Sequence, residues 1–260
     1  MPRTDAVGAP TRIRSVAKAI QILMFLSEEN EGATARGVAE ALGLPVATAH
    51  HLLNTLQAEG MLAKDSFRRF HLGPAVGALT DAFLRRPAPP GYLIEPLRDL
   101  AAETGETAYL SGWQHDEAVV LATVEGSHAV HVKGLHTGFT GFTHARASGK
   151  LFLAFAHPDL REGYLARGPL EARTPHTIVD PDDLRQELKR VAKRGYSVDR
   201  EEFTLGVSCV SAPVLEGGIA VATYTAAAPT ARFERDRAEL TTAVLAAARA
   251  ARAASGRASA

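Results

Sequence analysis

The sequence predicts an α+β protein of two unequal domains, in which three helices and a β-hairpin precede a larger antiparallel sheet covered by helices. Three observations carry this prediction. Apolar residues recur at helical spacing in three segments within the first 59 residues. Beyond residue 107, short β-branched segments occur in groups with helical segments between them. A proline-rich segment separates the two regions, and 260 residues leave room for both domains.

The first domain is predicted to open with three short helices. Ser15 is placed as the cap of the first helix. The inward positions of that helix follow three-and-four spacing: Val16, Ala19, Ile20, Leu23, Met24 and Leu26. Thr34 caps the second helix, Gly43 ends it, and Pro45 opens a third helix that runs to about Glu59. The tight turn between the second and third helices predicts a helix-turn-helix.

A β-hairpin is predicted directly after the third helix. Residues 61–64 and 69–72 form two short segments around a polar tip at Asp65 and Ser66. A hairpin in this position is the expected wing of a winged helix-turn-helix domain.

A linker is predicted near residue 90. A helix begins at Pro74 and runs to about Leu84, and residues 85–91 then hold three prolines, which deny the chain helical hydrogen bonds. We therefore place the first domain at residues 12–73, a linker helix with a proline-rich linker at 74–91, and the second domain at 92–254.

The second domain is predicted to form one antiparallel sheet with helices on it. Its expected strands are residues 107–113, 118–124, 129–133, 196–199, 208–214 and 219–225. Its expected helices are residues 94–103, 148–156, 158–166, 182–194 and 232–254.

Composition restricts where the protein works. The single cysteine, Cys209, excludes an intramolecular disulfide, and residues 1–14 lack the apolar stretch of a signal peptide. No run of about 18 apolar residues is present to span a bilayer. We expect a cytoplasmic protein that does not bind membranes.

The third helix has the surface that a DNA-recognition helix needs. Its inward stripe leaves a small polar face that can enter the major groove, and basic residues flank the domain. A merely solvated helix face is the competing interpretation. The residues predicted to bind DNA are Arg12, Arg14, Thr34, Ala47, Thr48, His50, His51, Asn54, Arg68 and Arg69.

Motifs along almost the whole chain are similar to those of one family. In the first half they are residues 15–23, 44–45, 48–50, 52–53, 60–62 and 72–73. In the second half they are residues 103–107, 144–145, 148–150, 174–178, 194–199, 201–203, 206–207, 209 and 212–214. In this order they resemble the isocitrate-lyase-regulator (IclR) family of bacterial transcription factors, and the resemblance covers residues 12 to 252.

The resemblance implies a regulator, not an enzyme. It implies a GAF-like second domain with a pocket on one side of its sheet for a small organic or aromatic acid, and no cofactor. It also implies operator DNA as partner and repression, and we expect a homodimer or dimer of dimers paired through the N-terminal domains and the helix before the linker. The effector-binding positions carried over by motif are Ala147, Ser148, Asp199, Cys209, Thr225 and Ala227.

The chain departs from the family pattern at two places. Members often have an arginine where this recognition helix has His51, so we expect looser phosphate contact there, compensated by Arg12, Arg14 and the wing arginines. Members often have Ser-x-Ser-Gly-Pro on the last strand, where residues 225–229 read Thr-Ala-Ala-Ala-Pro. One hydroxyl fewer predicts a less polar ligand.

Some roles stay open at this stage. Asp199 is interpreted as a group that selects a hydrogen-bond donor on the ligand, and Cys209 either contacts ligand or fills the core. Tyr109 and Trp113 share a strand face and form either a pocket wall or part of the core.

Other function classes find weaker support. Four histidines raise the question of zinc, but none is spaced as a ligand pair, and we expect no metal: His128, His131, His136 and His144. Ser148 lies outside any Gly-x-Ser-x-Gly nucleophile motif. A module that binds ligand and protein partners without DNA remains the alternative.

Overall fold

The computed structural model describes residues 13–84, 89–132 and 135–258. Arg12 therefore lies outside the described residues. The chain divides into two compact units, Met1–Ala88 and Pro89–Ala260, and each is described by itself. Among the described residues, every helix is too short or too polar to cross a membrane.

The first unit contains the expected helix-turn-helix. Its helices are α1 (Arg14–Glu28), α2 (Ala35–Ala41) and α3 (Val46–Ala58). The Thr34 hydroxyl accepts a hydrogen bond from the Gly37 N–H at 3.2 Å and so caps α2, as expected. Pro45 occupies the N-cap position of α3, and Leu53 of that helix is fully buried in the core of the unit.

The prediction for α1 was wrong in two respects. The helix begins at Arg14, so Ser15 lies within it and does not cap it. Half of the predicted inward stripe is also wrong, because Val16, Ile20 and Met24 are each 52–53% exposed, whereas Leu26 is buried and Ala19 and Leu23 pack against the core as predicted. Helix α1 packs on α3 and β2 through its opposite face. Its apolar residues extend beyond that face onto the side that the first unit leaves exposed.

The wing forms as predicted. Strands β1 (Leu62–Lys64) and β2 (Phe70–Leu72) pair antiparallel. Asp65 orders the tip between them, because its Oδ1 accepts from the Arg69 N–H at 2.8 Å and its Oδ2 lies 3.0 Å from His71 Nε2. Helix α4 (Pro74–Leu84) follows directly.

The second unit is a five-stranded antiparallel sheet with helices on both faces. Its strands, β3 (Thr107–Gln114), β4 (Glu117–Val124), β5 (Ser197–Arg200), β6 (Val207–Glu216) and β7 (Ile219–Pro229), lie in the order β4-β3-β7-β6-β5. Its helices are α5 (Gly91–Thr104), the 3-10 turn η1 (Thr143–Ala145), α6 (Ala147–Ala154), α7 (Pro158–Leu165), α8 (Pro181–Arg194) and α9 (Thr230–Ala258). The predicted α+β class and antiparallel sheet are confirmed.

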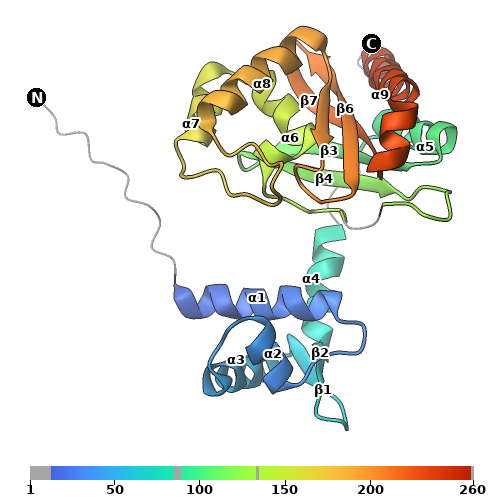
Figure 1. Cartoon of the computed structure of the whole chain (residues 1–260). Coiled ribbons are helices and arrows are strands. Elements are labelled where there is room, and N and C mark those ends of the chain that lie inside the picture. Colours follow the sequence, from blue (N-terminus) through green and yellow to red (C-terminus); the bar gives the residue numbers. More distant parts are fainter. Residues whose placement is uncertain (1–12, 85–88, 133–134, 259–260) are drawn as a thin grey trace, which may run out of the picture. The chain divides into compact units, whose positions relative to one another are not determined.

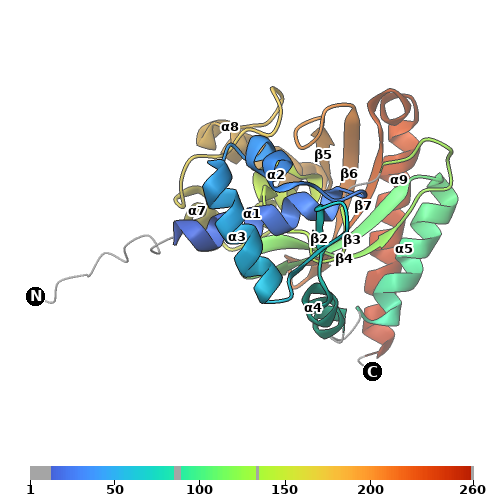
Figure 2. The same ribbon diagram turned by 90° about the horizontal axis from the view of Figure 1, so that it is seen from below.

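The two faces of the sheet differ in chemistry. Helices α5 and α9 lie side by side on one face (Figures 1 and 2), where they pack on apolar side chains such as Leu110, Val210 and Tyr224. Helix α6 packs on the opposite face, with α7 and α8 beyond it (Figure 1).

The expected strand at residues 129–133 is not formed, since residues 129–132 have no strand structure and 133 lies outside the described residues. Strand β3 already has β4 and β7 as its two neighbours. The outer edge of β4 bonds to a different segment, because the Val120 N–H donates to Phe139 O at 3.0 Å and the Gly138 N–H donates to Val120 O at 2.7 Å. Residues 138–139 therefore occupy this edge of β4 in place of the predicted strand.

Candidate functional site

The outer face of α3 carries the predicted DNA-binding side chains. Ala47, His50, His51 and Asn54 are exposed, and Thr48 is half-buried. Within the described part of the chain, neither histidine side chain takes part in a hydrogen bond or ion pair. The face therefore presents small or polar groups that are free to meet a partner.

Arginines extend this surface on the wing. Arg68 lies exposed at the tip with a φ of +63°, and no described residue forms an ion pair with it. Arg69 is partly committed to the fold, since its Nη1 donates to Gly32 O at 2.9 Å. Arg14 is exposed at the start of α1. Arg68 is thus the freer of the two wing arginines.

The sheet register brings the predicted effector-binding residues of the strands together. Asp199 lies opposite Cys209, and Cys209 lies opposite Ala227. Thr225 lies opposite Tyr109 in the neighbouring row. Residues directly opposite one another in a sheet share a face, so these side chains belong to one surface, which is the surface covered by α6.

The start of α6 brings the remaining two predicted residues to this surface. Ala147 and Ser148 are both buried in the first turn of the helix, whose leading N–H groups have no partner inside the helix. Gly149 permits the close approach, because a Cβ there would lie 2.0 Å from Thr143 O. The predicted effector-binding residues therefore lie partly on the sheet and partly on α6, which packs against that face of the sheet.

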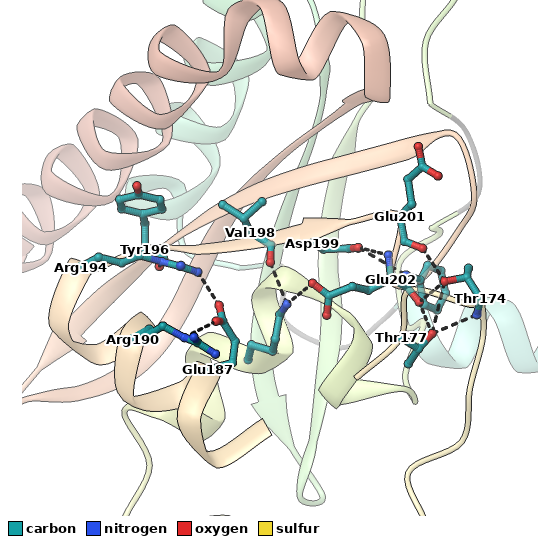
Figure 3. A network of polar contacts seen from close by, with 12 residues as sticks. Thr174, Thr177, Glu187, Arg190, Arg194, Tyr196, Val198, Asp199, Glu201 and Glu202 are labelled. Atoms are coloured by element: carbon teal, nitrogen blue, oxygen red, sulfur yellow. Dashed lines mark hydrogen bonds and ion pairs between the residues drawn. The ribbon is translucent and has the colours of Figure 1, made fainter. Parts of the chain in front are cut away.

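A buried polar network fixes the turn beside this surface (Figure 3). Lys150 is fully buried, and its Nζ donates to Val198 O at 2.7 Å and to Glu202 Oε1 at 2.5 Å. Asp199 Oδ1 accepts from the Glu202 N–H at 2.7 Å and from the Phe203 N–H at 3.4 Å. Asp199 therefore holds the turn after β5, a structural role that sequence reasoning did not predict.

Asp199 is also a buried acid with an altered pKa. Burial raises the pKa of its carboxyl to about 7, although the Lys150 ammonium acts in the opposite direction. The folded protein consequently favours the protonated carboxyl more than the unfolded chain does. Near pH 7 this group is divided between its two forms, so it can either donate to a ligand or accept from one.

Asp199→Asn is expected to remove a pH dependence of stability. The raised pKa means that Asp199 stabilises the fold below about pH 4, and that this contribution is lost as pH rises toward 7 at about 1 kcal/mol per pH unit. Urea unfolding followed by Trp113 fluorescence should show that the free energy of unfolding of the variant rises relative to that of the wild type between pH 5 and 7. A constant difference between the two proteins would contradict this.

Sequence reasoning missed Arg146, which precedes α6. It is 3% exposed, its Nη1 donates to Ala118 O at 2.9 Å, and its guanidinium lies 5.2 Å from the centre of the Phe139 ring. Burial lowers its pKa to about 10, so it remains charged at pH 7. Nothing local in the sequence distinguishes this arginine from an exposed one in a loop.

The structure bears on the open roles of Cys209 and of Tyr109 with Trp113. Tyr109 is 2% exposed and packs with Cys209 and Ala227, with Phe139 against them. Burial raises the pKa of the Cys209 thiol well above its usual value, which keeps it protonated and a poor nucleophile. Trp113 is half-buried and its ring centre lies 5.6 Å from that of Phe152, so it belongs to the packing under α6.

His144 serves the fold of the second unit. Its Nδ1 lies 3.0 Å from the Tyr164 hydroxyl and its Nε2 lies 3.0 Å from Glu171 O, which occupies both ring nitrogens. Across residues 13–84, 89–132 and 135–258, no three His, Cys, Asp or Glu side chains are grouped to hold a metal ion.

Comparison with known proteins assigns both units. Residues 15–66 match the IclR helix-turn-helix domain, and residues 93–253 match the C-terminal domain of the bacterial transcriptional regulator IclR. The transcriptional regulator BhcR of Paracoccus denitrificans is 33% identical over 239 residues, which are 90% of this chain and 85% of that protein. The transcriptional repressor IclR of Escherichia coli K12 is 29% identical over 83% of this chain and 79% of its own length.

A solved structure agrees with these sequence matches. The IclR protein of Thermotoga maritima superposes with a TM-score of 0.66 at 27% identity, over 93% of this chain and 98% of that one. The relatives are DNA-binding transcriptional regulators and not enzymes. This chain belongs to the IclR family of bacterial transcriptional regulators.

Proposed function

We propose that this regulator is a cytoplasmic repressor that binds operator DNA through α3 and the wing, and that a small organic acid bound on the α6 face of its sheet changes that binding. The observation that carries the proposal is the free polar face of α3 beside the unpaired Arg68. The working parts are a DNA-binding domain at residues 12–73, a linker helix and linker at 74–91, and an effector-binding domain at 92–254.

A homodimer, or a dimer of dimers, accounts for the exposed side of α1. Val16, Ile20 and Met24 lie at three-to-four spacing on that side and are about half exposed. A second copy of the chain placed there would bury an apolar stripe that one chain leaves open. Pairing through α1 would set the distance between two recognition helices, which must match two operator half-sites.

Effector control then follows from linkage. The effector can change operator affinity only to the extent that it prefers one arrangement of the paired DNA-binding domains over another. The domains that bind DNA and effector are joined through α4 and residues 85–91, so the arrangement of these domains is the quantity that the effector must influence.

Arg68→Ala is expected to weaken operator binding and its salt dependence. Losing one phosphate contact should reduce the slope of log affinity against log salt by about 1 for each DNA-binding domain. Gel retardation at several salt concentrations measures both quantities, with DNA from upstream of the protein's own gene and neighbouring genes as probes.

Two controls make this measurement specific. Arg68→Lys keeps the charge and should keep most of the salt slope, and Arg98→Ala removes an exposed arginine from α5 and should change neither quantity. An unchanged slope in Arg68→Ala would exclude the wing contact. A wild-type protein that retards none of these probes would favour the ligand-binding module without DNA binding.

A further inference from the structure

Arg146 is a buried cation that lacks an acidic partner. Among the described residues no carboxylate lies within 4.0 Å of its guanidinium, and its Nε makes no hydrogen bond. Lys150, four residues later, is buried to the same degree but is neutralised by Glu202 at 2.5 Å. The same segment therefore holds one compensated cation and one uncompensated cation.

An uncompensated buried charge is costly, because the protein interior replaces water poorly. The ring of Phe139 and the single bond to Ala118 O return only part of the lost hydration. Arg146 contributes to folding less than an apolar residue of its size would. A negatively charged partner from outside the chain would supply what is missing.

Other unused hydrogen-bond donors lie in the same region. The Tyr109 hydroxyl is buried and has no hydrogen-bond partner in the described part of the chain. Arg146 is close enough to Cys209, Glu117, Asp199 and Tyr109 for each to influence its pKa. The first turn of α6, which follows Arg146 directly, adds N–H groups without helical partners.

The remaining wall of this region is apolar. Tyr109 and Cys209 pack with aliphatic and aromatic side chains: Val120, Val132, Leu135, Phe139 and Ala227. Phe139 in turn meets the ring of Phe203 at 5.7 Å, over the turn that Asp199 holds. A ligand here meets the Arg146 cation and N–H donors at one end and the rings of Phe139 and Phe203 at the other, where the exposed Arg173 guanidinium lies 5.0 Å from the Phe203 ring centre.

Building on the proposed function, we infer that Arg146 binds the acid group of the effector, and that the effector is a monocarboxylate with an apolar ring or branched chain. A second carboxylate on the ligand would not pair with Lys150, which is committed to Glu202, and it would lie near the acidic Asp199. Arg146 is thereby the residue that selects an anion, in a site where one hydroxyl of the usual last-strand motif is replaced by Ala227.

The first test needs no variant. Isothermal titration of the full chain with benzoate and with 3-methylbutanoate should show saturable binding of at least one of them. Benzamide or 3-methylbutanamide, which have the same shape without the charge, should bind about tenfold to a hundredfold more weakly. Phthalate and inorganic phosphate should also bind more weakly. Equal binding of acid and amide, or no binding of either acid, overturns the inference.

The second test removes the charge from the protein. Arg146→Gln should lose about tenfold to a hundredfold in affinity for the acid while its affinity for the amide stays the same. Arg167→Gln, which alters an exposed arginine paired with Asp116, should bind both ligands like the wild type. Arg146→Gln with wild-type affinity for the acid contradicts the inference, and circular dichroism establishes that each variant is folded.

Failure here is distinguishable from failure of the proposed function. Arg146→Gln should still retard operator DNA when no effector is present, but its DNA binding should no longer respond to the acid. A wild type that binds benzoate or 3-methylbutanoate but no DNA would leave the assignment of Arg146 intact and remove only the repressor proposal.

Discussion

Lys150→Met is expected to lower the free energy of unfolding of the second unit by about 3 to 5 kcal/mol, because it leaves the Glu202 carboxylate buried without its cation. Glu202 Oε2 already lacks a hydrogen-bond partner among the described residues, so the carboxylate has no alternative donor nearby. Val198 O would lose its lysine donor as well. Trp113 is the single tryptophan, so urea unfolding followed by its fluorescence reports on this unit.

A second substitution separates the charge effect from simple loss of packing. Glu202→Gln added to Lys150→Met removes the stranded charge and should restore much of the lost stability. Lys189→Met, at an exposed position of α8, should leave the unfolding midpoint unchanged. If the double variant were no more stable than Lys150→Met, an unpaired carboxylate would not be the cause of the destabilisation.

Gly149→Ala is the second change with a large expected effect, a loss of about 3 kcal/mol or more. The added Cβ would lie 2.0 Å from Thr143 O, a backbone atom that cannot rotate away. Helix α6 must therefore shift from η1, and Ser148 and Arg146 shift with it. Affinity for a carboxylate effector should fall together with the urea midpoint.

Gly163→Ala provides the matched control within α7. A Cβ at this position meets no atom within 4 Å, so the substitution should raise helix stability by about 0.5 to 1 kcal/mol. The two glycine variants are thus expected to change stability in opposite directions. Destabilisation by both would mean that the contact with Thr143 is not what makes residue 149 sensitive.

The fold was predictable where local signals agree with tertiary packing. Helix α8 shows this, because Asp180 accepts from the N–H groups of its first turn, Pro181 begins it, and Gly195 ends it with a φ of +78°. All three signals are visible in the sequence. The wing was equally accessible, since two short strands and a polar tip are local features.

Predictions failed where the outcome depends on distant segments. The exposed side of α1 has the same apolar spacing as a buried one, and only the positions of α3 and β2 decide which side is covered. Residues 129–132 have strand-like composition, but the edge of β4 pairs with Gly138 and Phe139 instead.

The candidate site was predictable to a similar extent. Family resemblance supplied Asp199, Cys209 and Ala227, and the register places them in one row. It did not supply Arg146, because whether an arginine is buried, and whether it meets a carboxylate, depends on contacts with β4 and with Phe139. Whether these residues bind an effector remains a prediction.

The pairing of Gly138 and Phe139 with Val120 also bears on self-association. An uncovered edge strand invites β-strands of other molecules to add to the sheet, and the opposite edge here is β5, only four residues long. Phe139 therefore belongs both to the apolar cluster around Tyr109 and Cys209, where we propose that ligand binds, and to the segment that covers this edge of β4. A substitution of Phe139 made to change effector specificity would also change how well this edge of β4 is covered. Aggregation of such a variant should therefore be measured together with its ligand preference.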